Sequence, residues 1–498
     1  MKYEAVIGLE VHAQIHTHSK MYCSCPVVAD TGDVPPNTQV CPVCLALPGT
    51  LPVVNRRAVE LGIMTGLALG CTINPVNVFA RKSYFYPDLP KGYQISQYEL
   101  PLAVNGALEI ETEAGLQRIG ITRAHLEEDT AKLYHQDDGS ALVDFNRAGI
   151  PLIEIVSEPD LRSVEAVQAY ATTLRDVLIY LGINAGDMEK GEMRFEANVS
   201  IRPAGTTALG TRTEIKNLNS FRALAASVAY EIERQKAVLA DGGKVLQQTL
   251  GWDEPGGRTY PQRSKEYAHD YRYFPEPDIP PLEIAADGSP ELAAGWIETL
   301  QAQVPELPLA KKRRLMAEYG IRPYDAALLV SDRRVADYFE TAAGIARAQG
   351  VTAQDVANWV GGELFRILNT TATSIDACQT TPERLAALLV LVQQGTVSVT
   401  AAKRALDAMC ETGKAPEDVV HRLGLTQISD TDALTALIEA ALDAHPAQVQ
   451  QYLDGKTNIL GWLVGQVMKA SKGKANPQDT RRLLEEALER RGTLGPVS

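Results

Sequence analysis

A strict alternation of apolar and polar residues opens the chain and constrains its fold more than any other feature. Between Tyr3 and His16 the odd positions are apolar from Ile7 to Ile15, and the even positions are polar from Glu10 onward. A period of two predicts a β-strand with one packed face. Because side chains two residues apart point the same way, Glu10 and His12 lie side by side, as metal ligands or as an acid/base pair. A solvated sheet face would show the same alternation.

Three later segments repeat this pattern with more carboxylates. EMRFEANVSIR, residues 192–202, alternates without an error and carries Glu196 on its polar side. PLIEIVSEPD, residues 151–160, places Glu154 among apolar residues, where a carboxylate is usually paired or bound to a cation. The segment 120–135 holds four ionisable residues within five positions: His125, Glu127, Glu128 and Asp129. These acids either face water or are neutralised by a cation, and such a sheet face suits a metal-bound, phosphate-bearing substrate.

Four of the seven cysteines form two close pairs after the first strand. They are arranged as C-x-C, a fifteen-residue spacer and C-x-x-C: Cys23, Cys25, Cys41 and Cys44. Two pairs, each on a tight turn, can bring four thiolates to one tetrahedral zinc ion, and four cysteine ligands leave no open position for catalysis. The alternative is four buried or reactive thiols. The prolines beside the pairs favour a structural zinc knuckle over residues 23–44.

Cations and aromatic residues alternate in ARKSYFYPDLPKGYQISQ, residues 80–97. The segment contains Arg81, Lys82 and Lys91 together with Tyr84, Phe85, Tyr86 and Tyr93. Lysine and arginine bind phosphate, and flat rings bind a base or ribose, so the pattern is compatible with a nucleotide site. A rigid surface loop would have the same composition.

The chain's length and charge limit the classes of protein to which it can belong. Its 498 residues predict about three domains. No run of about 18 apolar residues occurs, and the first ten residues contain Glu4 and Glu10, so we expect a cytoplasmic protein without a membrane span. A net charge of −14 argues against a chain that coats nucleic acid along its length, although a local basic surface could still bind a polyanion.

Helical periodicity replaces the strand pattern in the second half. Four prolines between Pro275 and Pro281 indicate a linker, and helices are expected from about residue 291 onward. Between Gly455 and Arg491 lysine and arginine outnumber acids by eight to four, and three of the lysines are Lys469, Lys472 and Lys474. This basic tail is a candidate for contacts with a phosphate backbone, with a solvated helix face as the alternative.

Several long motifs together resemble one protein family. They are GLEVHAQ, RKSYFYPDLPKGYQISQ, HLEED, PLIEIVSEPD, KNLNSF, DYRYFPEPD and GQVMKASKGKANP. They are similar to the B subunit of the bacterial tRNA-dependent amidotransferase that acts on misacylated Glu-tRNA(Gln) and Asp-tRNA(Asn), and the similarity runs over nearly the whole chain.

The resemblance implies an α+β fold with three parts. These are a mainly antiparallel-sheet cradle over residues 1–292, a helical domain over 293–405 and a helical tail over 406–498 that touches tRNA. It implies that the cradle uses ATP and magnesium to phosphorylate the carboxylate of the esterified amino acid. Ammonia from a partner amidase, the A subunit, then displaces phosphate, and a small C subunit completes a heterotrimer.

The resemblance also assigns site residues. It implies a magnesium site of Glu10, His12, Glu128, Glu154 and Glu196, the last standing where the family more often has aspartate. From the residues themselves we expect Lys82 to stabilise the transferred phosphoryl group, and Arg81, Lys82, Tyr84 and Lys91 to bind the nucleotide.

Two other functions are alternatives to the amidotransferase subunit. A non-catalytic tRNA-binding module with a zinc knuckle would need no joint site of Glu10, His12 and Glu154. A stand-alone amidase lacks its serine and lysine motif, so glutaminase activity should lie on another chain. The sequence leaves open which of the two misacylated tRNAs is used.

Overall fold

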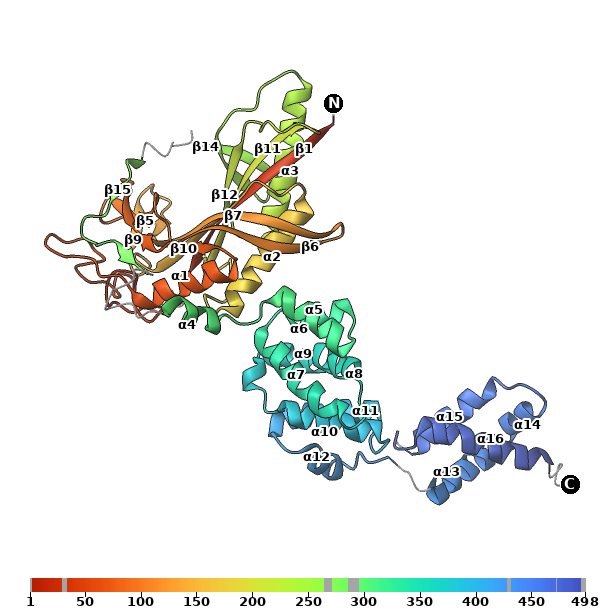
Figure 1. Ribbon diagram of the computed structural model, residues 1–498. Coiled ribbons are helices and arrows are strands. Elements are labelled where there is room, and N and C mark those ends of the chain that lie inside the picture. The colour runs from red at the N-terminus through yellow and green to blue at the C-terminus, as the bar shows by residue number, and fades with distance from the viewer. Residues whose placement is uncertain are drawn as a thin grey trace. The chain divides into compact units, whose positions relative to one another are not determined.

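A computed structural model describes residues 2–28, 34–263, 271–284, 295–427, 431–471 and 473–493. The chain divides into two compact units, Met1–Leu309 and Ala310–Ser498 (Figure 1). Strands are confined to the first unit, and the described part of the second unit is helical, so the α+β class is confirmed.

A nine-stranded sheet forms the centre of the first unit, in the order β14-β13-β12-β11-β1-β10-β7-β6-β2. Its strands are β1 (Tyr3–Gln14), β2 (Thr72–Ile73), β6 (Ala103–Thr112), β7 (Gly115–Glu128), β10 (Pro151–Ser157), β11 (Met193–Pro203), β12 (Thr213–Leu218), β13 (Thr249–Asp253) and β14 (Arg258–Arg263). Among the described strand pairs only β12 and β13 run parallel. The opening strand therefore lies in the interior of the sheet, between β10 and β11.

A smaller three-stranded sheet has the order β15-β4-β5. It comprises β15 (Phe274–Pro275), β4 (Phe79–Ser83) and β5 (Tyr93–Gln97), and two short pairs complete the strands: β3 (Val76–Asn77) with β16 (Leu282–Glu283), and β8 (Lys132–His135) with β9 (Ala141–Asp144). Hydrogen bonds join β5 to the end of β7: Ser96 Oγ donates to Glu127 over 2.7 Å, and the Ile95 N–H donates to Glu128 over 3.0 Å.

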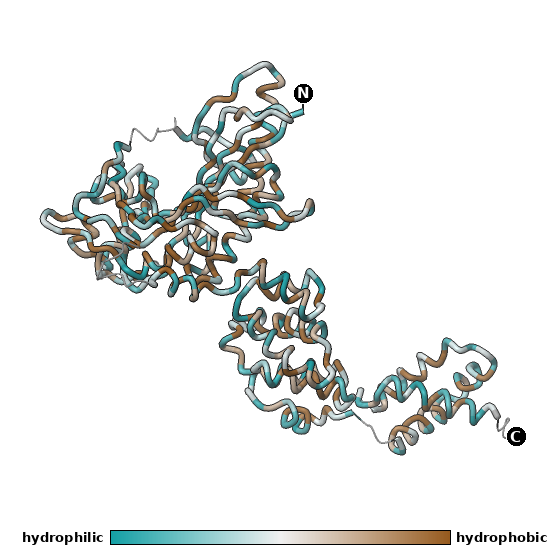
Figure 2. Tube along the Cα trace, viewed as in Figure 1, coloured by the Kyte–Doolittle hydropathy of each residue, from teal (hydrophilic) through white to brown (hydrophobic). Residues whose placement is uncertain are grey.

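Helices bury the apolar side of the large sheet. They are α1 (Arg56–Ala68), α2 (Val164–Tyr180) and α3 (Phe221–Ala240), and α4 (Trp296–Gln303) packs against α1. The apolar positions predicted for β1 are buried with Tyr170 and Leu174 of α2 in one hydrophobic cluster. The brown, hydrophobic stretches of Figure 2 gather where the strands and α1 meet. Asparagine or serine caps the first three helices by accepting backbone N–H bonds at Asn55, Ser163 and Ser220.

The first unit extends past residue 292, where the sequence had suggested a boundary. Leu300 of α4 belongs to its core, and Trp296 and Ile297 pack against that core. The Arg56 guanidinium also lies 5.7 Å from the Trp296 ring centroid. These contacts assign α4 to the sheet-containing unit.

The second unit consists of α5 (Pro308–Tyr319), α6 (Pro323–Leu329), α7 (Arg333–Arg347), α8 (Ala353–Asn358), a π-helical turn (Trp359–Leu364), α9 (Phe365–Thr371), a 3-10 turn (Ile375–Ala377), α10 (Pro382–Gln393), α11 (Val399–Thr412), α12 (Pro416–Arg422), α13 (Thr431–Ala444), α14 (Pro446–Leu453), α15 (Ile459–Ala470) and α16 (Pro477–Thr493). One apolar cluster runs from Leu315 to Leu425 and another from Leu434 to Leu488. The expected boundary at 405 falls inside α11, whose buried face belongs to the first of these clusters.

In the described chain no helix is both long and apolar enough to cross a membrane.

Candidate functional site

Strand pairing sets polar side chains of four segments next to one another. In the register of the large sheet His12 lies opposite Glu154 of β10 and Arg194 of β11, and Glu10 lies opposite Glu196. Glu154 in turn lies opposite His125 of β7. Directly opposed residues share a face of the sheet, so the polar side of β1 meets polar residues on both neighbours.

Five polar side chains of β1, β7 and β10 form what we call the carboxylate cluster: Glu10, His12, His125, Glu127 and Glu154. His12 Nε2 is 3.2 Å from a carboxylate oxygen of Glu154 and 3.7 Å from one of Glu127. His125 Nε2 is 3.3 Å from Glu127 and 3.7 Å from Glu154. Glu127, Glu154 and His125 are buried. Three acids so placed need positive charge close by.

The pKa values of two residues on β1 reflect this concentration of negative charge. Burial raises the pKa of Glu10 to about 7, and Glu154 and Glu196 raise it too. Burial acts to lower the pKa of His12, but its hydrogen bond to Glu154 and the nearby carboxylates outweigh burial and raise that pKa to about 9. The cluster therefore favours a cation beside Glu10 and Glu154.

Lys82 of β4 faces the cluster. It lies opposite Gln94 of β5, whose side-chain amide donates to Glu127 over 3.2 Å. Burial opposes the charge of Lys82, but Glu127 is first among the neighbours that hold its pKa above the usual value, and Glu154 and Glu10 contribute. In return Lys82 is the main charge that overcomes burial and keeps the pKa of Glu127 at about 2. An ammonium group of the small sheet and a carboxylate of the large sheet thus each favour the charged form of the other.

A second acidic group adjoins the cluster and shares Glu10. Glu10, Glu196 and Glu214 each offer a carboxylate oxygen within 4.8 Å of the others. Lys216 Nζ lies 2.7 Å from Glu196 and 3.9 Å from Glu214. Glu196, predicted as a ligand, thus reaches the site but is paired with Lys216, a residue of β12 on the same polar face.

The donor set fits a hard divalent cation. Two overlapping triads, Glu10–His12–Glu154 and His125–Glu127–Glu154, each have ligand atoms within 4.8 Å of one another. Oxygen donors predominate, as magnesium prefers, and the histidines add one nitrogen to each triad. One ring nitrogen of His125, Nδ1, is buried without a hydrogen-bond partner among the described residues.

Glu128, which the resemblance assigned to the magnesium site, lies outside the cluster. Its carboxylate contacts Lys91 Nζ at 2.7 Å and accepts the Ile95 N–H bond. Neighbouring residues on a strand point to opposite faces, so Glu128 cannot share the face of His125, whereas Glu127 does. The structure puts Glu127 in the cluster instead of Glu128. The two-residue spacing from His125 is the sequence signal that could have identified Glu127.

The structure also separates the four residues that were expected to bind the nucleotide. Arg81 Nε and Nη2 donate to the two carboxylate oxygens of Glu276 at 2.8 and 2.9 Å, and Nη2 also reaches Asp278 at 3.0 Å. Arg81 also lies over the Tyr93 ring, 4.3 Å from its centroid. It is opposite Ile95, on the other face of β4 from Lys82. Tyr84 packs beside Tyr86, with ring centroids 5.8 Å apart. Among the four candidates, Lys82 carries the positive charge that lowers the pKa values of Glu127 and Glu154 in the cluster.

The four predicted knuckle cysteines converge. Their sulfur atoms all lie within 4.8 Å of one another, so the group could hold a metal ion. A hydrogen bond from Cys23 lowers the pKa of Cys44 to about 5. The Lys20 ammonium, whose residue is fully buried, lies 3.9 Å from Cys44 Sγ and favours the thiolate form.

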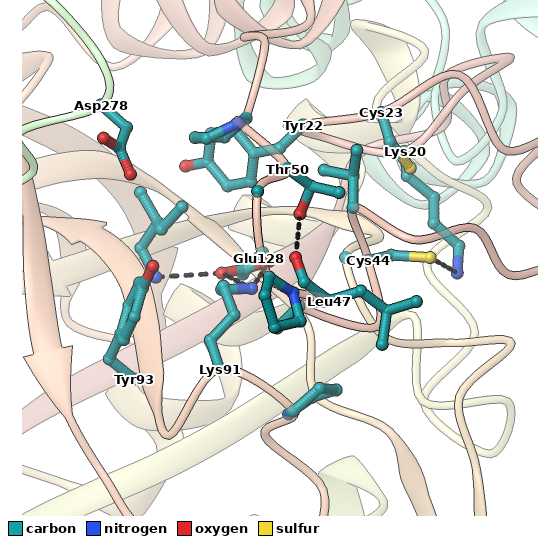
Figure 3. A pocket seen from close by; sticks show the side chains of 18 residues that line it. Lys20, Tyr22, Cys23, Cys44, Leu47, Thr50, Lys91, Tyr93, Glu128 and Asp278 are labelled. Carbon is teal, nitrogen blue, oxygen red and sulfur yellow. Dashed lines mark hydrogen bonds and ion pairs between the residues drawn. The ribbon is translucent and has the colours of Figure 1, made fainter.

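A cavity of about 260 Å³ lies between these cysteines and Glu128. Figure 3 shows Cys23, Cys44 and Lys20 at one end, and Lys91, Tyr93 and Asp278 with Glu128 at the other. The cavity thus uses Glu128 of β7, whereas the carboxylate cluster uses Glu127, whose side chain lies on the opposite face of that strand.

Comparisons with known proteins show the family to which this sequence belongs. A family model described as the GatB/GatE catalytic domain matches residues 5–288, and one described as the GatB domain matches residues 337–488. The chain belongs to the B subunits of the aspartyl/glutamyl-tRNA(Asn/Gln) amidotransferases. The subunit of this name from Roseiflexus castenholzii is 51% identical over 98% of this chain and 100% of its own length. The one from Moorella thermoacetica is 51% identical over the same shares of both chains, and that from Dehalococcoides mccartyi is 48% identical over 98% and 99%. The carboxylate cluster and the cysteine group both fall inside the matched catalytic domain of this B-subunit family.

Proposed function

We propose that this chain is the subunit of a glutamine-dependent ligase in which ATP activates the side-chain carboxylate of a misacylated tRNA for amidation. The substrates are Glu-tRNA(Gln), Asp-tRNA(Asn) or both. The observation that carries the proposal is the carboxylate cluster with Lys82 facing it, within a chain whose relatives carry the name of this amidotransferase.

Magnesium and ATP fit this site, and Glu10, His12, Glu127 and Glu154 are the residues that would hold the metal. When bound, magnesium cancels negative charge on the triphosphate and on the amino acid's carboxylate. The second acidic group, with Glu196 and Glu214, adjoins the same position. A cysteine group without histidine or carboxylate suits structural zinc.

The chain's own residues would perform two tasks in this reaction. The acids and His12 fix the position of the cation, and the surrounding sheet keeps them rigid. Lys82 faces the charge that develops on the transferred phosphoryl group. The substrate carboxylate attacks the terminal phosphorus of ATP, ADP leaves, and ammonia then displaces phosphate from the acyl phosphate to give the amide. The amidase A subunit would supply ammonia, and a small C subunit would complete the assembly.

The proposal is tested with the assembled complex, by measuring ATP hydrolysis and amide formation with each misacylated tRNA in turn. Glu10→Gln and Glu154→Gln should each lower amide formation by about a hundredfold or more, even with ammonium as the nitrogen donor. Glu158→Gln is the matched control, because Glu158 lies just beyond β10 and is exposed. Parent-rate amidation by either cluster variant would refute the assignment and favour the tRNA-binding module without catalysis.

A further inference from the structure

A small aromatic pocket lies beside the carboxylate cluster, and the proposed chemistry leaves it without a role. It has a volume of about 180 Å³ and is lined by Val78, Ala80, Tyr98, Glu99, Leu100, Tyr273, Phe274 and Pro275. Pockets that enclose a whole drug-sized ligand usually measure roughly 300–1,000 Å³, so this one has room for one ring system.

Two tyrosines give the pocket a flat wall. The rings of Tyr98 and Tyr273 stack with centroids 4.3 Å apart and an interplanar angle of 10°. Tyr98 is 40% exposed and Phe274 is 46% exposed. Exposed rings around a hollow mark a binding surface more often than a packing feature, and a stacked platform accepts a further flat ring on its open side.

The pocket connects directly to the reacting end of the site. Ala80 of the pocket and Lys82, which faces the cluster, are two residues apart on β4 and share a face of the three-stranded sheet. Burial raises the pKa of the Tyr273 hydroxyl to about 12, and Lys82 and Glu127 are among the charges that act on it. Ala80 also lies opposite Ser96 of β5, whose hydroxyl donates to Glu127 of the cluster over 2.7 Å, so the pocket adjoins the cluster.

The charges around the pocket distinguish a base from a phosphate. Its lining contains no lysine or arginine, and its charged member is the acid Glu99. Lys82 lies two residues beyond Ala80 on β4, and Arg123 Nη2 lies 3.6 Å from Glu154. Phosphates inside the pocket itself would therefore lack counter-charges, whereas an uncharged base needs none.

We propose that this pocket binds the adenine ring of the 3′-terminal adenosine of the aminoacyl-tRNA. This inference rests on the proposed function. Only ribose, an ester and the amino acid separate that adenine from the reacting carboxylate, so no phosphate has to cross the stretch between Tyr273 and Lys82. The adenine of ATP, in contrast, is separated from the transferred phosphoryl group by two further phosphates.

The kinetic test compares Tyr98→Leu with the parent in the assembled complex. Loss of one base stack should raise the KM for the misacylated tRNA on the order of tenfold and leave the KM for ATP unchanged. Tyr98→Phe keeps the ring and should restore the parent value. Tyr134→Leu is a matched control, because Tyr134 is also 40% exposed but lies on β8, outside the pocket lining.

A binding test removes the adenine instead of the tyrosine. Deacylated tRNA that lacks only its terminal adenosine should bind the parent complex about tenfold more weakly than complete tRNA, and the Tyr98→Leu complex should bind both equally. A higher KM for ATP with an unchanged KM for tRNA in the Tyr98→Leu complex would show that the pocket binds ATP and would overturn the inference. Unchanged KM values for both substrates, in a Tyr98→Leu complex that melts at the parent temperature, would also overturn it. A parent complex that forms no amide would instead contradict the proposed function.

Discussion

Glu127 and Glu128 are consecutive residues of β7, yet their carboxylates take entirely different partners. Glu127 contacts His125, His12 and Ser96, whereas Glu128 contacts Lys91 and the backbone of Ile95. One acid belongs to the carboxylate cluster and the other lines the cavity beside the cysteines. Two neighbouring acids of equal chemistry should therefore differ in function.

We expect Glu127→Gln to reduce tRNA-dependent ATP hydrolysis by about a hundredfold or more, because the variant removes one carboxylate from the cation site. Glu128→Gln should hydrolyse ATP within a few-fold of the parent rate, since its carboxylate does not reach the cluster. ATP hydrolysis in the presence of misacylated tRNA measures both. Equal losses in the two variants would contradict the assignment of Glu127.

The cysteine group should hold about one zinc ion per chain, as a single four-thiolate site requires. Cys41→Ser is expected to lose most of this zinc and to melt at a lower temperature, because the ion ties residues 23–25 to residues 41–44. Elemental analysis of the purified protein measures the metal. Cys378→Ser, in the second unit, should keep the full zinc content, and full zinc in Cys41→Ser would exclude the site.

Asp129 should make a measurable contribution to stability. It accepts a 2.7 Å bond from Arg194 and a 2.8 Å bond from Gln14, and Arg147 Nε lies 3.5 Å away. We expect Asp129→Asn to lower the free energy of unfolding by on the order of 2 kcal/mol at pH 7. This is less than the roughly 3–5 kcal/mol of fully buried pairs, because Arg194 is partly exposed.

The pH dependence of that difference follows from the lowered pKa of Asp129. Burial acts to raise this pKa, but Arg194 and Arg147 overcome it and bring the value to about 2, below the ordinary 3.8. The stabilisation is therefore present above about pH 4 and is lost as the pH falls toward 2. Calorimetric melting of parent and variant should show a gap at pH 7 that narrows at pH 3. A gap of constant size would contradict this.

The basic tail should add tRNA affinity without changing the chemical step. Lys469 is exposed at the end of α15, and several tail arginines are already paired, such as Arg482 with Glu486 at 2.9 Å. Replacing Lys469, Lys472 and Lys474 with alanine should raise the KM for tRNA and flatten its salt dependence, because fewer counterions are released. Lys472 lies outside the described residues. Lys236→Ala, in the first unit, is the control, and an unchanged salt slope would reject direct contact.

Periodicity and spacing predicted much of this protein correctly because they act over a few residues. The alternation in residues 3–16 identified the buried and polar faces of β1, and the spacing of Cys23, Cys25, Cys41 and Cys44 predicted their convergence. The helices expected from about residue 291 onward also form, from α4 to α16. Local backbone geometry decides these features.

Only tertiary structure decided which polar residues share a site. The pairing of β10 with β7 selects Glu127 over Glu128, and the pairing of β4 with β5 turns Lys82 toward the carboxylates and Arg81 toward Glu276. A shift of one residue in either register would reverse the choice that it governs, and register depends on contacts between segments far apart in the chain. The limit of the first unit was likewise set by packing, since Leu300 joins a core that also contains residues of β1 and α1, far earlier in the chain.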